Sequence, residues 1–146
     1  MLNKVKIAID AMGGENSPRK IIEGIEISLK SNQENFFYLY GKKDLLEKEI
    51  YKKKYIQKYS EIVHTEDIIL DDESPLTAAK KSKNTSMWKA IESLKEKKSH
   101  ISLSAGNTGA LLIISRLLLK TVTGISKPAL AALWPNQNNM NVVLDL

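Results

Sequence analysis

Short apolar runs alternate with longer stretches in which apolar side chains recur at helical spacing. Runs rich in β-branched and aromatic residues predict strands over residues 5–9, 36–40, 61–64, 100–103, 128–135 and 141–146. Helical spacing of Ile21, Ile22, Ile25 and Leu29 predicts a first helix after Ser17 and Pro18. Further helices are predicted over residues 42–58, 85–97 and 110–119. Such alternation is typical of an α/β fold with a largely parallel sheet.

Two serine–proline pairs are expected to begin helices. Ser17 and Ser74 each precede a proline, so the serine would be the N-cap and the proline the first helical residue. The helix over residues 110–119 is apolar nearly all round, yet it is shorter than the roughly 20 residues that cross a bilayer. We therefore expect a buried central helix or one at a subunit interface.

The chain is organised around residues 104–112, SAGNTGALL, which join a predicted strand to this apolar helix. Gly106 and Gly109 allow a tight turn and the close approach of a ligand, and Asn107 or Thr108 can cap the helix. Unpaired N–H groups at a helix N-terminus suit a phosphate or a carboxylate. Neither common phosphate-binding fingerprint is present, so anion binding and a plain strand-to-helix turn both stay open.

A second glycine loop follows the first predicted strand. It begins at Asp10 and contains Gly13 and Gly14. Ligands of parallel α/β sheets bind beyond the carboxyl ends of strands, so we expect the two loops to converge on one site. Asp10 would orient a donor or bind a metal there, or would serve only as a turn residue. Ser104 lacks the surroundings of a nucleophile elbow.

Composition excludes several kinds of chemistry. There is no cysteine, which rules out disulfides, thiolate metal sites and a cysteine nucleophile. His64 and His100 lie outside any metal-ligand spacing, so structural or surface roles are expected. The N-terminal residues lack the apolar run of a signal peptide, which favours a cytoplasmic protein.

The net charge of +5 is concentrated in lysines of residues 42–58. These lysines indicate a solvated helical face or, alternatively, a surface for an acidic protein or anionic lipid headgroups. A nucleic acid partner is not expected, because no aromatic or arginine platform accompanies them.

Four segments together resemble the bacterial phosphate acyltransferase family PlsX: residues 7–14 (IAIDAMGG), 72–75 (DESP), 104–110 (SAGNTGA) and 128–131 (PALA). The resemblance covers the whole chain but only about the N-terminal half of the family. It implies an α/β/α sandwich like that of phosphotransacetylases and isocitrate dehydrogenases, a homodimer and peripheral association with the membrane. The implied activity transfers a fatty acyl group from acyl carrier protein to inorganic phosphate, which gives an acyl phosphate for phospholipid synthesis.

The chemistry of the two glycine loops indicates which of their residues form the site. Asn107 is expected to donate to the oxyanion, with Asp10 and Thr108 as further catalytic candidates. Backbone and side-chain groups of the two loops would bind phosphate, namely Gly13, Gly14, Ser104, Gly106 and Gly109. No cofactor or metal is expected, because phosphate is already anionic and can attack a thioester once it is positioned.

The chain ends in an apolar predicted strand, where family members usually continue into a Gly-Ala-Asn loop. No linker divides the chain, so residues 1–146 are expected to be the N-terminal part of one acyltransferase domain, truncated and inactive alone. Two alternatives belong to other classes of protein. A nucleotide-binding α/β enzyme would need a Rossmann fingerprint, which the sequence lacks. A non-catalytic remnant or binding module fits the abrupt end.

Overall fold

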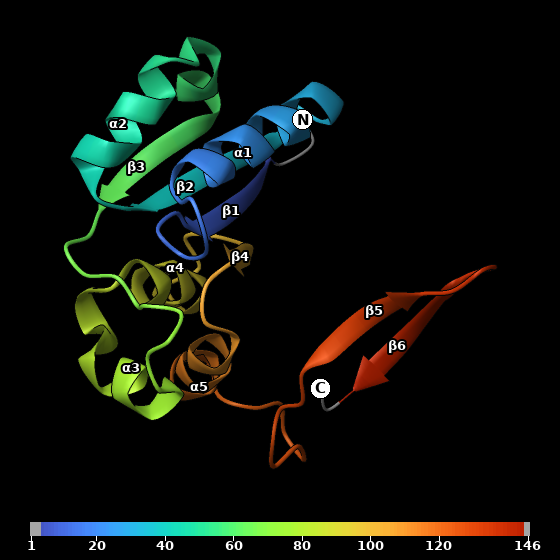
Figure 1. Ribbon diagram of the computed structural model, residues 1–146. Helices are drawn as coiled ribbons and strands as arrows, with labels where there is room; N and C mark the ends of the chain where they lie inside the picture. Colours follow the sequence, from blue (N-terminus) through green and yellow to red (C-terminus); the bar gives the residue numbers. More distant parts are fainter. Residues whose placement is uncertain (1–3, 145–146) are drawn as a thin grey trace.

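The computed structural model describes residues 4–144, apart from the side chains of residues 81 and 82. Its centre is a parallel sheet of four strands in the order β3-β2-β1-β4 (Figure 1). These strands are β1 (Val5–Asp10), β2 (Asn35–Gly41), β3 (Ser60–His64) and β4 (Ile101–Ser104). The predicted α/β class with a largely parallel sheet is confirmed.

Helices cover both faces of the sheet because the side chains of β1 alternate between two apolar layers. Ile7 and Ile9 join a core with α1 and α2, whereas Ala8 packs with Ala90 of α4. A further cluster joins α3, α4 and α5 beneath that second face (Figure 1). The helices are α1 (Arg19–Ser31), α2 (Lys43–Tyr51), α3 (Pro75–Lys81), α4 (Ser86–Lys95) and α5 (Thr108–Leu119), with short 3-10 helices at Lys54–Tyr59 and Ser82–Asn84.

The two serine–proline pairs behave differently. Ser74 caps α3 as predicted, since its Oγ accepts the N–H of Thr77 at 3.3 Å. The prediction for Ser17 is wrong, because its hydroxyl donates to the carbonyl of Gly13 at 2.5 Å instead. Helix α1 accordingly begins at Arg19 and has no side-chain cap.

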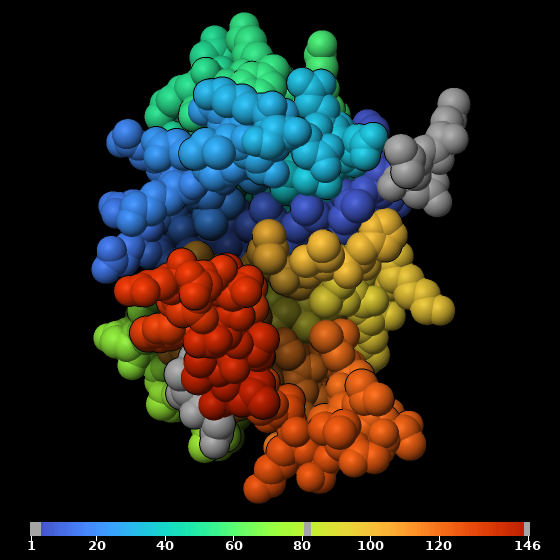
Figure 2. All heavy atoms as spheres, turned by 90° about the vertical axis from the view of Figure 1, so that its right-hand side faces the viewer, coloured from blue at the N-terminus to red at the C-terminus, as the bar shows by residue number. Residues whose placement is uncertain are grey.

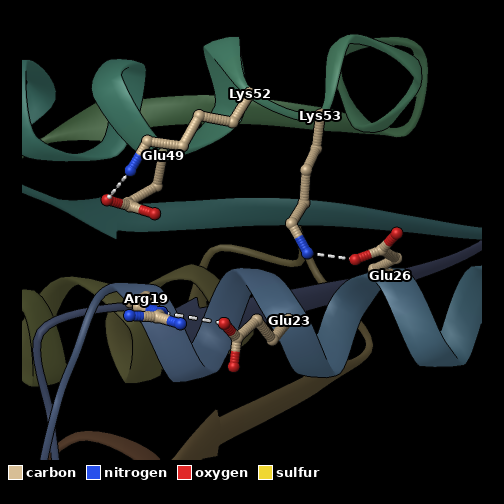
Figure 3. A network of polar contacts seen from close by, with 6 residues as sticks. All are labelled: Arg19, Glu23, Glu26, Glu49, Lys52 and Lys53. Atoms are coloured by element: carbon tan, nitrogen blue, oxygen red, sulfur yellow. Dashed lines mark hydrogen bonds and ion pairs between the residues drawn. The ribbon is translucent and has the colours of Figure 1, made fainter.

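The lysine-rich stretch divides into two helices rather than one. Helix α2 ends at Tyr51, and a 3-10 helix follows at Lys54–Tyr59. Lys53 reaches across to Glu26 of α1, and Lys52 pairs with Glu49 at 2.8 Å (Figure 3). The charges of these two lysines are therefore balanced within the molecule. The half-buried Lys53–Glu26 pair lies between α1 and the residues after α2, whereas Lys52 is exposed and its pair contributes little to stability.

Helix α5 buries one side only. Ala110, Ile114 and Leu118 pack with α3 and α4, while Leu117 and Leu119 are exposed. No helix of the described residues is long and apolar enough to cross a membrane.

The last two predicted strands form a separate antiparallel hairpin of β5 (Ala131–Pro135) and β6 (Met140–Leu144). They pair antiparallel, because the turn between them is too short for the crossover that parallel strands need. They form a sheet of their own and do not extend the parallel sheet. Asn136 stabilises this turn, since its Oδ1 accepts the N–H groups of Asn138 and Asn139 at 2.9 and 2.7 Å.

This hairpin lies at the surface and carries large exposed apolar side chains (Figure 2). Leu133 is 64% exposed and lies opposite Val142, which is 66% exposed. Because exposed apolar strands promote association, we expect the chain to self-associate at rising concentration in sedimentation experiments. Changing Leu133 and Val142 to threonine keeps the strand preference and should restore the monomer. A single monomeric boundary for the unchanged chain at every concentration would refute this expectation.

Candidate functional site

The two glycine loops meet at the carboxyl edge of the parallel sheet, as predicted. Strands β1 and β4 are neighbours, and Asp10 lies opposite Ser104 at the end of both strands. The segments that follow them, residues 11–18 and 105–107, leave the sheet side by side. One site is thus formed by residues almost a hundred positions apart in the sequence.

A chain of hydrogen bonds joins the two loops. The hydroxyl of Ser104 donates to Oδ2 of Asp10 at 2.7 Å. The same hydroxyl oxygen accepts the N–H of Gly106 at 3.1 Å, and Oδ1 of Asp10 accepts the N–H of Met12 at 3.4 Å. The carboxylate therefore holds the backbone of its own loop and, through Ser104, that of the neighbouring loop.

The glycines of these loops allow direct contact between the two backbones. A Cβ atom on Gly13 would lie 2.5 Å from Oδ2 of Asp10 and 2.9 Å from the nitrogen of Gly106. Gly14 has a φ of +85°, and a Cβ there would lie 2.6 Å from the carbonyl oxygen of Ala105. Since the loops touch each other, a phosphate would lie beside them rather than between them.

Asp10 is a buried acid, with only 2% of its surface exposed. Burial raises the pKa of its carboxyl group, while hydrogen bonds from Ser86, Ser104, Met12 and Gly13 oppose that rise. Ser86 comes from the first turn of α4 and was not among the predicted site residues. The only sequence signal for it is its place at the start of the helix predicted over residues 85–97.

No cluster of three or more histidine, cysteine or acidic side chains able to hold a metal ion occurs within residues 4–144 as described. The two histidines instead support the backbone, as their predicted structural role requires. Nδ1 of His64 accepts the N–H of Lys43 at 3.2 Å, and Nδ1 of His100 accepts the N–H of Lys6 at 3.0 Å.

Asn107 uses every hydrogen-bonding group of its carboxamide within the protein. Its Oδ1 caps α5 by accepting the N–H of Ala110 at 2.9 Å, so Asn107 rather than Thr108 is the cap. Its Nδ2 donates to the carbonyl oxygens of Asp71 and Glu73, at 3.1 and 2.8 Å. Both amide hydrogens thus point to the acidic residues 71–73, which directly precede α3 in the sequence.

The first turn of α5 combines close packing with unused backbone donors. A Cβ on Gly109 would lie 2.5 Å from Cγ of Pro75, so this glycine makes room for the start of α3. Thr108 is exposed. The N–H groups of these two residues lie in the first turn, where no intrahelical acceptor exists. Within the described part of the chain, no other acceptor for them is found.

The chain is similar to known proteins along nearly its whole length. Residues 5–146 match the model of the family described as "Fatty acid synthesis protein". A protein of Pelagibacter ubique named phosphate acyltransferase is 56% identical over 142 residues, which cover 97% of this chain and 42% of that protein. Proteins of the same name from Rhodopseudomonas palustris and Bradyrhizobium diazoefficiens are 42% and 41% identical, over 100% of this chain and 42% of each relative.

The chain therefore spans about 42% of the length of these curated relatives. The match begins at the first residues of β1 and includes both glycine loops. The chain belongs to the fatty acid synthesis protein family, in agreement with its sequence resemblance to the PlsX phosphate acyltransferases.

Proposed function

We propose that this chain supplies the phosphate-binding part of an enzyme that transfers a fatty acyl group from acyl carrier protein to inorganic phosphate. One observation carries the proposal. Two glycine loops, joined through Asp10, Ser104 and Gly106, lie at the carboxyl ends of adjacent parallel strands. They do so in a chain that is similar over its full length to proteins named phosphate acyltransferase.

The reaction needs positioning more than a strong base. An oxygen of HPO₄²⁻ attacks the thioester carbonyl, the carbon–sulfur bond breaks, and the phosphate proton passes to the departing thiolate. The products are an acyl phosphate and the thiol of the carrier. Because the nucleophile is already anionic, the protein has to orient it and stabilise the oxyanion that forms at the carbonyl.

The first turn of α5 offers suitable donors for that task. The backbone N–H groups of Thr108 and Gly109 lie where the helix dipole is positive, and the exposed hydroxyl of Thr108 is next to them. Gly106 approaches from the preceding loop, whose position Ser104 and Asp10 fix. Asp10 holds this loop in place through Ser104, and its buried carboxylate is shielded from an incoming anion.

A homodimer and peripheral membrane association belong to the same proposal. The exposed apolar side chains of the hairpin and of α5, including Leu133, Trp134 and Leu117, support contacts with other surfaces. The lysines of residues 42–58 support an encounter with acidic carrier protein or anionic lipid, although Lys52 and Lys53 are paired internally.

The test joins these 146 residues to the remaining residues of the Pelagibacter ubique relative; this fusion is called the joined protein below. With acyl carrier protein thioester as donor, we expect the joined protein to release thiol only when phosphate is added. Sulfate in place of phosphate is the control for ionic strength, and the 146-residue chain alone should be inactive. Thiol release that does not depend on phosphate, or its absence from a folded joined protein, would refute the proposal.

A further inference from the structure

The segment of residues 71–75, here called the acidic segment, lies against the first turn of α5. Asn107 contacts it across 36 and 34 sequence positions, through the carbonyl oxygens of Asp71 and Glu73. The two bonds measure 3.1 and 2.8 Å, and they consume both hydrogens of the carboxamide. While the segment stays in place, this carboxamide has no hydrogen left for a substrate.

A second residue of α5 independently accommodates the same segment. Gly109 faces Pro75 so closely that a Cβ would lie 2.5 Å from Cγ and 3.2 Å from Cβ of the proline. Gly109 lies within α5 and does not have a positive φ, so its conformation does not require glycine. Glycine is required here instead to leave room for Pro75 of the acidic segment. The cap residue Asn107 and Gly109 of the first turn therefore both contact this segment.

We propose that Asn107 is a positioning residue, which fixes the acidic segment beside the anion-binding turn of α5 and does not itself contact the reacting atoms. This inference rests on the proposed function, and it differs from the oxyanion donor expected from the sequence. It assigns phosphate binding at this turn to backbone groups of Thr108 and Gly109.

Because the acidic segment is negatively charged, its position should affect how tightly phosphate binds at the first turn of α5. Its side chains include those of Asp71, Asp72 and Glu73, and carboxylates are attracted to helix N-termini. If the backbone of the segment is released, its carboxylates can reach the same N–H groups that phosphate would use. Loss of the Asn107 bonds should therefore weaken phosphate binding, because the carboxylates would compete with phosphate for these N–H groups. The chemical step itself should change little.

Two variants distinguish the two functions of the Asn107 side chain, which caps α5 and donates to the acidic segment. In Asn107→Ser and Asn107→Asp, the side-chain oxygen still caps α5, but both bonds to the segment are lost. Ser74→Ala is the matched control, because it removes a side-chain bond from the same segment to Thr77 of α3 and leaves Asn107 unchanged.

The first measurement needs no enzymatic activity. The N–H of Glu73 donates to the carbonyl of Leu70 at 3.2 Å, so its hydrogen exchange reports the order of the acidic segment. In the 146-residue chain, we expect exchange at this amide to become about tenfold faster in both Asn107 variants and to stay unchanged in Ser74→Ala. Unchanged exchange in the Asn107 variants would overturn the proposal.

The second measurement uses the joined protein. Asn107→Ser should raise the KM for phosphate about tenfold and leave kcat within about twofold, because only competition at the helix terminus changes. A loss in kcat of about 10² or more with an unchanged KM would overturn the proposal, since that result marks a donor to the transition state. If the unchanged joined protein is inactive, the proposed function fails, while hydrogen exchange still decides whether Asn107 holds the segment.

Discussion

Replacing Gly13 with alanine is expected to reduce phosphate-dependent thiol release by the joined protein by about 10² to 10³-fold. The new Cβ would lie 2.5 Å from Oδ2 of Asp10, 2.9 Å from the nitrogen of Gly106 and 3.0 Å from Oγ of Ser104. These are the atoms that join the two loops, so the methyl group has to separate them. Crowding of this kind also lowers the free energy of unfolding, by about 1–3 kcal/mol.

Gly24→Ala is the matched control for this change. Gly24 lies within α1, and a Cβ there would meet nothing within 4 Å. Alanine should therefore leave turnover unchanged and stabilise the helix by up to about 1 kcal/mol. Normal turnover in Gly13→Ala would show that contact between the loops does not position the reacting groups.

Replacing Asp10 with asparagine should lower turnover of the joined protein by about 10²-fold. The carboxylate accepts the hydroxyl of Ser104 and the N–H of Met12, and an amide group cannot accept at both positions. One of the two loops would then lose its hydrogen bond to residue 10. Turnover close to that of the unchanged protein would exclude this function for Asp10.

The same variant tests the electrostatics of the buried acid. Burial raises the pKa of Asp10 above its ordinary value of 3.8, so the folded state binds this proton more tightly than the unfolded state. The protonated Asp10 carboxyl group therefore adds to the free energy of unfolding. This contribution is complete below the pKa of Asp10 in the unfolded chain and is lost as pH rises through its pKa in the folded chain. In denaturant unfolding between about pH 3 and pH 8, the unfolding free energy of the unchanged chain minus that of Asp10→Asn should fall with rising pH. A rise would mean that the hydrogen bonds outweigh burial.

Hydrophobic periodicity predicted the parallel sheet and its helices because their apolar faces repeat within each element. Ile22, Ile25 and Leu29 pack on the strand residues that the pattern indicated. The errors arise where polar contacts or chain length decide the structure. Ser17 bonds to Gly13 rather than capping α1, and the pairing of the last two predicted strands as a separate hairpin was not predicted.

The convergence of the two glycine loops was predictable, because neighbouring parallel strands end at one edge. The partners within the site were not, because they depend on contacts between segments far apart in sequence. Nothing near Asn107 in the sequence indicates that its amide hydrogens bind Asp71 and Glu73. Ser86 likewise reaches Asp10 only because α4 packs beneath β1.

The bond between Asp10 and Ser104 spans 94 residues, and this separation affects how the protein is made. At about 5–20 residues per second, Asp10 is synthesised roughly 5 to 20 seconds before its partner. During that interval β1 can pair with β2, but its other edge has no neighbour until β4 emerges from the ribosome. An open edge recruits other strands, so the nascent chain is most exposed to mispairing along the border where the site will form.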